Sequence, residues 1–336
     1  MKGKADGCAL SVVVPLYNEA ESLEPLYREI VAAADKSVPS FEIIFVDDGS
    51  CDDSLGRLRR LAAQDSRVKV ISLRSNCGKS AALAVGFAHV QGESVITMDG
   101  DLQDDPAEIP RLLATLEQGW DLVSGWKKKR HDPWRKRWSS KWFNLVTSML
   151  SGLRLHDFNC GLKAYRREVV RSIRVYGQLH RFLPVLAHWQ GFRVTEQVVH
   201  HRPRRFGKTK FGPWRFFAGF FDLLTVMFLM RFNRRPMHLF GFLGLLCFTA
   251  GSIITLYLAI MRLFYAVYLS NRPLLFLGIL LTIVGIQFVS IGLLGEMIAE
   301  SRAADRGYPI RLKIGWDEPP KGKSAQRTRA HYSRGR

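Results

Sequence analysis

The chain has little cysteine. Its 336 residues include five cysteines, at positions 8, 51, 77, 160 and 247. They are scattered and show none of the paired spacings of zinc ligands, which argues against a cysteine-based metal site. We expect them to remain reduced thiols, because the rest of the chain predicts a cytoplasmic setting.

Glycine is missing where two common nucleotide-binding loops would need it. A dinucleotide-binding loop requires Gly-x-Gly-x-x-Gly directly after the first strand, and residues 15–19 contain no glycine. The tripeptide Gly78–Lys79–Ser80 ends like a phosphate-binding P-loop, but Leu73 stands where that loop requires another glycine. NAD chemistry and P-loop nucleotide hydrolysis are therefore disfavoured.

Acidic residues are also scarce, since 30 Asp and Glu face 49 Lys and Arg and give a formal net charge of +19. Many basic residues crowd 127–141, interleaved with Trp134 and Trp138 and flanked by Trp126 and Trp142. Such a segment suits either nucleic acid or the headgroups of an anionic bilayer, where each Lys or Arg contributes about 1 kcal/mol.

Two long uncharged segments favour the bilayer over nucleic acid. Residues 237–261 and 273–294 are mostly apolar runs of 25 and 22 residues. A helix needs ~20 such residues to cross the hydrocarbon core. Buried helices of a soluble core are the alternative, but both runs exceed the usual length of core helices. We therefore expect a lipid bilayer as a partner and no nucleic acid.

Short apolar runs rich in β-branched residues predict strands in the first part of the chain. These runs are 10–14, 41–46, 68–73 and 94–98. Helical spacing of apolar residues over 21–34 and 54–64 separates the first three. Alternation of this kind predicts an α/β fold with an open, doubly wound sheet, in which ligands bind beyond the carboxyl ends of the strands.

Two carboxylates follow the fourth run. Asp99 and Asp101 lie one residue apart, and Gln103 completes the pentad 99–103. Carboxylate oxygens can hold a divalent cation such as Mg²⁺ against a diphosphate. Asp-x-Asp alone also occurs by chance in acidic loops, so the pattern gains its meaning from its place at a strand end. There it predicts a nucleotide-sugar site.

Taken together, the motifs resemble the inverting family 2 glycosyltransferases with the GT-A fold. More narrowly, they resemble the polyprenyl-phosphate branch, which includes dolichol-phosphate mannose synthase and bacterial undecaprenyl-phosphate glycosyltransferases. The segments occur in the family order between residues 9 and about 212. They are 14–19, 46–50, 76–79, 98–106, 157–163 and 204–210.

The resemblance implies a UDP- or GDP-sugar donor and Mg²⁺ or Mn²⁺ as cofactor. Asp101 and Gln103 match metal-ligand positions, and Asp99 matches a position that contacts the ribose and diphosphate region of the donor. These three residues form the predicted catalytic and metal-binding set. The residues predicted to bind the nucleotide are Pro15, Tyr17, Glu19, Asp47 and Lys79.

The resemblance also implies a polyprenyl phosphate acceptor, undecaprenyl or dolichyl phosphate. Lys127 and Lys141 match positions, usually arginine, that bind the acceptor phosphate. A phosphate whose second pKa is about 6 is already ionised near neutral pH, so it needs no general base. Arg204, Gly207 and Lys210 match a loop that closes over the donor diphosphate, although a surface loop without this function is the alternative.

Residues 214–230 carry only two charges, Arg215 and Asp222, which lie seven residues apart on one helical face. The segment predicts an amphipathic helix lying in the membrane interface, or else a core helix of the soluble domain. The predicted organisation is a GT-A catalytic domain over 1–212, a juxtamembrane amphipathic helix over 213–235, two transmembrane helices over 236–298 and a basic cytoplasmic tail over 299–336.

Three functions of different classes follow. The favoured one is transfer of a single sugar to a polyprenyl phosphate. A processive polysaccharide synthase is disfavoured because the chain has two spans and no Gln-x-x-Arg-Trp segment. A non-catalytic nucleotide-binding scaffold is disfavoured because Asp99, Asp101 and Gln103 are all present. The sugar stays unassigned, and a homo-oligomer is left open.

The flanking charges predict a membrane topology. Arginines precede the first span, and residues 301–336 carry ten Lys and Arg against three acids. Because positive charge favours the cytoplasmic side, we expect an integral protein of the inner membrane with its catalytic domain and both termini in the cytoplasm.

Cysteine labelling should place Asn271 outside and both Lys4 and Arg334 inside. Labelling of Arg334 from the outer face would contradict the hairpin.

Overall fold

The structure is a computed structural model, and it describes residues 7–128, 144–145, 147–149, 151–177, 179–203, 236–265, 273–301 and 308–316. The chain divides into two compact units. One combines Met1–Phe211 with Tyr308–Arg336, and the other is Gly212–Gly307. The predicted juxtamembrane helix, Lys141 and the predicted donor loop with Arg204, Gly207 and Lys210 lie outside the described residues.

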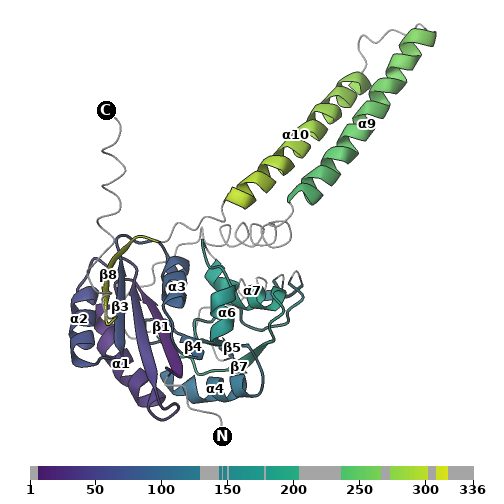
Figure 1. The fold of residues 1–336 in the computed structure, drawn as a ribbon. Coiled ribbons are helices and arrows are strands. Elements are labelled where there is room, and N and C mark those ends of the chain that lie inside the picture. The colour runs from purple at the N-terminus through teal and green to yellow at the C-terminus, as the bar shows by residue number, and fades with distance from the viewer. Residues whose placement is uncertain are drawn as a thin grey trace, which may run out of the picture. The chain divides into compact units, whose positions relative to one another are not determined.

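An eight-stranded mixed sheet runs through the first unit in the order β7-β5-β6-β4-β1-β2-β3-β8 (Figure 1). The strands are β1 Leu10–Leu16, β2 Phe41–Asp47, β3 Val68–Leu73, β4 Ser94–Thr97, β5 Leu122–Trp126, β6 Lys163–Arg166, β7 Val194–Val198 and β8 Ile310–Ile314. β1 pairs in parallel with both β2 and β4, and β2 pairs in parallel with β3. β6 is antiparallel to both β4 and β5, and β8 is antiparallel to β3. The predicted α/β sheet is confirmed, with antiparallel strands added beyond β4 and β3.

Helices cover both faces of this sheet. They are α1 Ala20–Ala34, α2 Ser54–Gln64, α3 Lys79–Ala88, α4 Ile109–Glu117, α6 Arg167–Ser172 and α7 Leu183–Trp189, with the 3₁₀ turns η1 Pro106–Glu108 and η2 Leu179–Arg181. Successive β1 side chains point to opposite faces. Val12 and Val14 are therefore buried in one apolar cluster with Leu26 of α1, while Val13 is buried in another with Leu83 of α3. Burial on both faces explains why these strands are continuous apolar runs.

The register places three strand ends at one edge of the sheet. Leu16 of β1 pairs with Asp47 of β2, and Val13 of β1 pairs with Thr97 of β4. The chain therefore leaves β1, β2 and β4 on the same edge, as expected for parallel strands of a doubly wound sheet. This edge is where the predicted nucleotide and metal residues lie.

The sheet is completed by residues that follow the apolar helices in the chain. β8 pairs with β3 from Val70↔Ile314 to Leu73↔Ile310. Its side chains alternate, with Ile310, Leu312 and Ile314 half-buried and the intervening residues exposed. This strand lies inside the segment 299–336 that the sequence analysis assigned to a basic tail, so at least 310–314 belongs with the catalytic sheet.

The second unit contains two long helices, α9 Pro236–Tyr265 and α10 Pro273–Ser301. Phe240–Tyr265 and Pro273–Leu294 are long and apolar enough to cross a membrane. Few of their side chains are buried, which contradicts the alternative of core helices in a soluble protein. Glycines allow the two helices to pack closely: a Cβ at Gly251 would lie 2.6 Å from the Gly278 carbonyl oxygen, and one at Gly285 would lie 2.7 Å from the Gly244 carbonyl oxygen.

The pairing of β8 predicts a difference between two truncations. A chain ending at Ser301 loses β8, whereas a chain ending at Trp316 keeps it. Partial burial of three aliphatic side chains and a strand's worth of hydrogen bonds is worth about 3 kcal/mol. Thermal unfolding in detergent should therefore show a lower Tm for the catalytic unit of the first variant and an unchanged one for the second. Equal transitions in both variants would contradict a stabilising function of β8.

Candidate functional site

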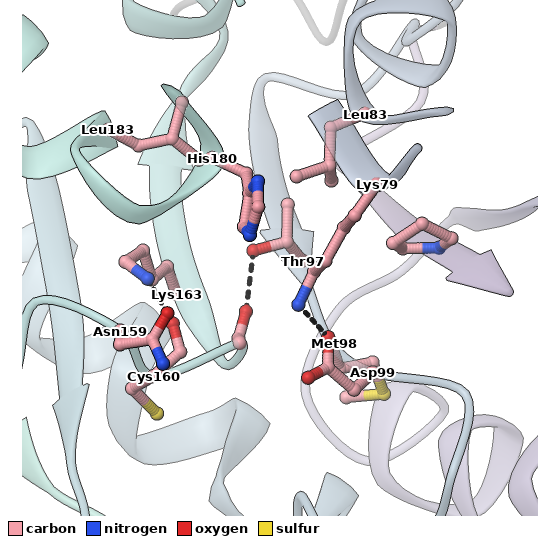
Figure 2. A pocket seen from close by; sticks show the side chains of 12 residues that line it. Lys79, Leu83, Thr97, Met98, Asp99, Asn159, Cys160, Lys163, His180 and Leu183 are labelled. Carbon is pink, nitrogen blue, oxygen red and sulfur yellow. Dashed lines mark hydrogen bonds and ion pairs between the residues drawn. The ribbon is translucent and has the colours of Figure 1, made fainter. Parts of the chain in front are cut away.

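A pocket lies at the carboxyl edge of the sheet (Figure 2). Pro15 contributes from β1, Thr97 and Asp99 from the end of β4, and Lys79 from the start of α3. The opposite wall comes from the segment before β6, the start of β6, η2 and the start of α7, and comprises Asn159, Cys160, Gly161, Lys163, His180 and Leu183. Three of the predicted residues, Pro15, Lys79 and Asp99, are therefore brought together from three distant parts of the chain.

Asp99 is the central charge of this pocket. Its carboxylate accepts a hydrogen bond from the Lys79 ammonium, and its backbone N–H donates to Asp104 at 3.1 Å. Burial alone would raise the pKa of Asp99, but Lys79 and then Lys127 outweigh it and lower the pKa to about 2. The group is therefore ionised throughout the physiological range.

Gly161 allows the segment before β6 to approach this carboxylate. A Cβ at position 161 would lie 2.6 Å from the carboxyl carbon of Asp99, closer than side chains normally come. The Gly161 carbonyl also accepts a hydrogen bond from the Thr97 hydroxyl at 2.9 Å. Glycine is thus required here for the close contact between the two walls.

The turn 99–103 is held in a strained conformation. Leu102 has φ 62°, a left-handed value that costs an aliphatic residue roughly 1 kcal/mol or more. Its side chain is 2% exposed and lies in the apolar cluster under the turn, which offsets this cost. Within the turn the Gln103 N–H donates to the Asp101 carboxylate at 3.1 Å. The Gln103 carbonyl in turn accepts from the Arg202 N–H at 2.9 Å.

The loops after β1, β2 and β3 are joined by hydrogen bonds at the predicted nucleotide side. Asp47 accepts from the Ser72 hydroxyl at 2.8 Å and from the Ser50 N–H at 2.9 Å. Asp48 accepts from the N–H groups of Cys77 and Gly78, both at 2.8 Å. Asp48, which the sequence analysis did not assign, therefore orients the turn that leads into α3 and Lys79.

Tyr17 and Glu19 lie beside these loops in the chain segment after β1. Both side chains are half-buried. The Glu19 N–H donates to the Ser54 hydroxyl at 3.1 Å, which ties this segment to the start of α2. Both residues therefore lie at the same edge as Asp47, and their contact with a nucleotide stays a prediction.

Lys127 is not an open surface lysine. Its side chain is 13% exposed, and its ammonium lies 2.8 Å from the Asp104 carboxylate, which is 1% exposed. Burial would lower the pKa of Lys127, but Asp104 outweighs this and raises it. Sequence reasoning missed this ion pair because no motif relates the end of β5 to the turn after β4. Its partner in the prediction, Lys141, lies outside the described residues.

His180 and Lys163 were also missed. The Ser80 hydroxyl lies 2.9 Å from His180 Nδ1, and burial and Lys79 lower the pKa of the imidazole to about 2, so it is neutral. Lys163 is 2% exposed and donates to the Cys160 carbonyl. Lys163 is the last residue of the motif segment 157–163, so the sequence carried a signal for it. His180 belongs to none of the motif segments.

The oxygen donors of the turn fit a hard divalent cation. Asp99, Asp101 and Gln103 offer carboxylate and amide oxygens from one short segment. Across the described ranges, no group of three or more His, Cys, Asp or Glu side chains could hold a metal ion unaided. Mg²⁺ and Mn²⁺ commonly take one or two carboxylates, which Asp99 and Asp101 can supply, and complete their coordination with substrate phosphate and water.

Comparisons with known proteins identify the family of this chain. The model described as glycosyl transferase family 2 matches residues 11–174. Dodecaprenyl-phosphate galacturonate synthase of Rhizobium johnstonii is 36% identical over 305 residues, covering 89% of this chain and 90% of that protein. Undecaprenyl-phosphate 4-deoxy-4-formamido-L-arabinose transferase of Pseudomonas syringae is 36% identical over 302 residues, covering 89% and 88%.

Solved structures show the same fold. Glucosyl-3-phosphoglycerate synthase from Mycobacterium tuberculosis, in complex with Mn²⁺, UDP and glucosyl-3-phosphoglycerate, aligns with a TM-score of 0.53 at 20% identity. The alignment covers 67% of this chain and 80% of that one. The resemblance inferred from the motifs, including its polyprenyl-phosphate branch, is confirmed by these findings. The chain belongs to glycosyl transferase family 2.

Proposed function

We propose that this protein transfers one sugar, with inversion, from a nucleotide-sugar donor to a membrane polyprenyl phosphate. The products are a polyprenyl-phosphate sugar and a nucleoside diphosphate. The observation that carries the proposal is the pocket at the carboxyl edge of the sheet, where Asp99 and Lys79 meet beside the turn bearing Asp101 and Gln103. The names of both relatives, a dodecaprenyl-phosphate and an undecaprenyl-phosphate enzyme, support the acceptor class.

The proposed chemistry needs no general base, because an ionised lipid phosphate is itself the nucleophile. Asp101, Gln103 and Asp99 would hold the divalent cation, which would neutralise charge on the leaving diphosphate. Lys79 can donate to a phosphate oxygen of the donor if its ammonium leaves Asp99. Pro15, Tyr17, Glu19 and Asp47 would hold the nucleoside, and Arg204, Gly207 and Lys210 would cover the diphosphate.

A membrane location is part of the proposal. The two apolar helices are each long enough to cross a bilayer. Because β3 and β8 pair in one sheet, the chain before and after these helices is on the same side of the membrane, which requires an even number of crossings. This supports a two-span hairpin. The positive charge flanking it supports a catalytic unit in the cytoplasm and a loop outside, and the proposed membrane is the inner membrane.

The decisive experiment supplies purified protein with UDP- and GDP-sugars, undecaprenyl phosphate and Mg²⁺ or Mn²⁺. Release of nucleoside diphosphate that depends on the lipid phosphate, with one sugar added to each lipid, would support the proposal. Addition of many sugars would favour a polysaccharide synthase instead. Nucleotide binding without release would favour a scaffold.

Asp101→Asn tests the metal assignment. The change removes one negative charge facing the diphosphate while retaining side-chain size. We therefore expect a folded, membrane-bound protein whose turnover is reduced at least about 10²-fold. Steady-state assays across Mn²⁺ concentrations would measure this. Asp53→Asn, an exposed carboxylate at the start of α2, is the matched control. Transfer by Asp101→Asn at close to the parent rate would show that the metal assignment is wrong.

Lys141→Ala tests acceptor binding. If Lys141 holds the lipid phosphate, its removal should raise the apparent KM for undecaprenyl phosphate about tenfold or more with little effect on the KM for the donor. Lys141→Arg should be tolerated, since guanidinium binds phosphate through two parallel hydrogen bonds. An alanine variant with parent kinetics would show that Lys141 belongs to the part of the basic segment 127–141 that faces lipid or solvent.

A further inference from the structure

Lys163 is a buried cation that the mechanism above does not use. It begins β6, where it pairs with Thr97 of β4 and Ser124 of β5. Its side chain is 2% exposed, and it lines the pocket together with Lys79 and Asp99. Figure 2 shows it beside Asn159 and Cys160, on the wall across from Lys79 and Asp99.

Lys163 differs from three other lysines of the catalytic unit in the kind of group that it contacts. Lys69 lies 2.6 Å from Glu42, Lys127 lies 2.8 Å from Asp104, and Lys79 is paired with Asp99. Lys163 donates to a neutral group, the Cys160 carbonyl. Within the part of the chain that the structure describes, no carboxylate forms an ion pair with it.

An ammonium group in this position is costly. Burial removes its hydration, and one carbonyl satisfies one of its three N–H donors. Burial accordingly lowers the pKa of Lys163, and the neighbouring charge of Lys79 lowers it further, although Cys160, Asp157 and Asp99 oppose the shift. For stability alone an apolar side chain of similar volume would serve as well or better.

The charge balance of the pocket points to an anion. When Lys163 is protonated, Lys79 and Lys163 carry two positive charges against the single negative charge of Asp99, and His180 is neutral. An anionic ligand would compensate the excess charge and supply acceptors for the remaining N–H donors of Lys163.

We infer that Lys163 binds a phosphate oxygen of a substrate in this pocket, as a cationic contact on the wall opposite Lys79. The inference rests on the proposed function, in which two phosphate-bearing ligands meet here. The phosphate is either that of the donor diphosphate or that of the lipid acceptor. Both offer the same chemistry, and binding measurements separate them.

The test replaces Lys163 by Met, which keeps length and volume but removes charge, and by Arg, which keeps charge. Lys313→Met, on the exposed face of β8, is the matched control. Calorimetric titration with UDP and with GDP in the presence of Mn²⁺ measures the donor side. Titration with undecaprenyl phosphate in detergent micelles measures the acceptor side.

We expect Lys163→Met to weaken binding of one class of probe at least about tenfold, with Lys163→Arg and the control close to the parent. Loss confined to the nucleotides assigns the contact to the donor, and loss confined to the lipid assigns it to the acceptor. The Tm of Lys163→Met should be unchanged or higher, because an unpaired buried charge is removed. A purely structural lysine would instead lower the Tm and leave the affinities unchanged.

Lys163→Gln keeps the test decisive if the Met variant does not fold, since glutamine can still donate to the Cys160 carbonyl. Binding by Lys163→Gln equal to that of Lys163→Arg would overturn the inference, as would parent affinities for both probes in Lys163→Met. If the parent transfers sugar while these variants are unaffected, this inference alone is wrong. A parent that binds none of the probes would overturn the inference and the proposed function together.

Discussion

The site depends on keeping one half-buried carboxylate ionised. Asp99 is close enough to Lys79, Lys127 and Lys163 for all three to favour its charged form, although burial opposes it. Each lysine comes from a different element, so the electrostatic balance also holds α3, β5 and β6 around the end of β4. Loss of any one of these lysine charges would raise the pKa of Asp99, because each of them favours the ionised carboxylate.

The surrounding backbone is arranged to support this concentration of charge. Parallel strands bring the ends of β1, β2 and β4 to one edge, and the side chains of Asp47 and Asp48 then fasten the loops that follow. Leu102 holds the turn from below through burial of its own side chain. The strain of its backbone is therefore offset by burial of its side chain in the apolar core.

Much of this arrangement could be predicted from the sequence because its signals are local. The runs that became β1 to β3 are apolar on both faces, and their ends are marked by polar turn residues such as Asp47. The two candidate membrane spans could be recognised from the length of their uncharged, apolar runs. Features that depend on register could not be predicted: the pairing of Lys127 with Asp104, the position of His180, and the antiparallel β6 all require knowing which segments become neighbours.

β8 could not be predicted because it is short and surrounded by basic residues, and its partner lies far away along the chain. That distance has a consequence for biosynthesis. The edge of β3 cannot acquire β8 until both apolar helices have been synthesised, so the sheet is completed last. Before that moment the edge of β3 presents unpaired backbone N–H and C=O groups, with which a strand of another chain could pair. Completion of the sheet therefore waits for the segment that follows both apolar helices, and a chain that stops before this segment would leave an incomplete sheet for cellular proteases to recognise.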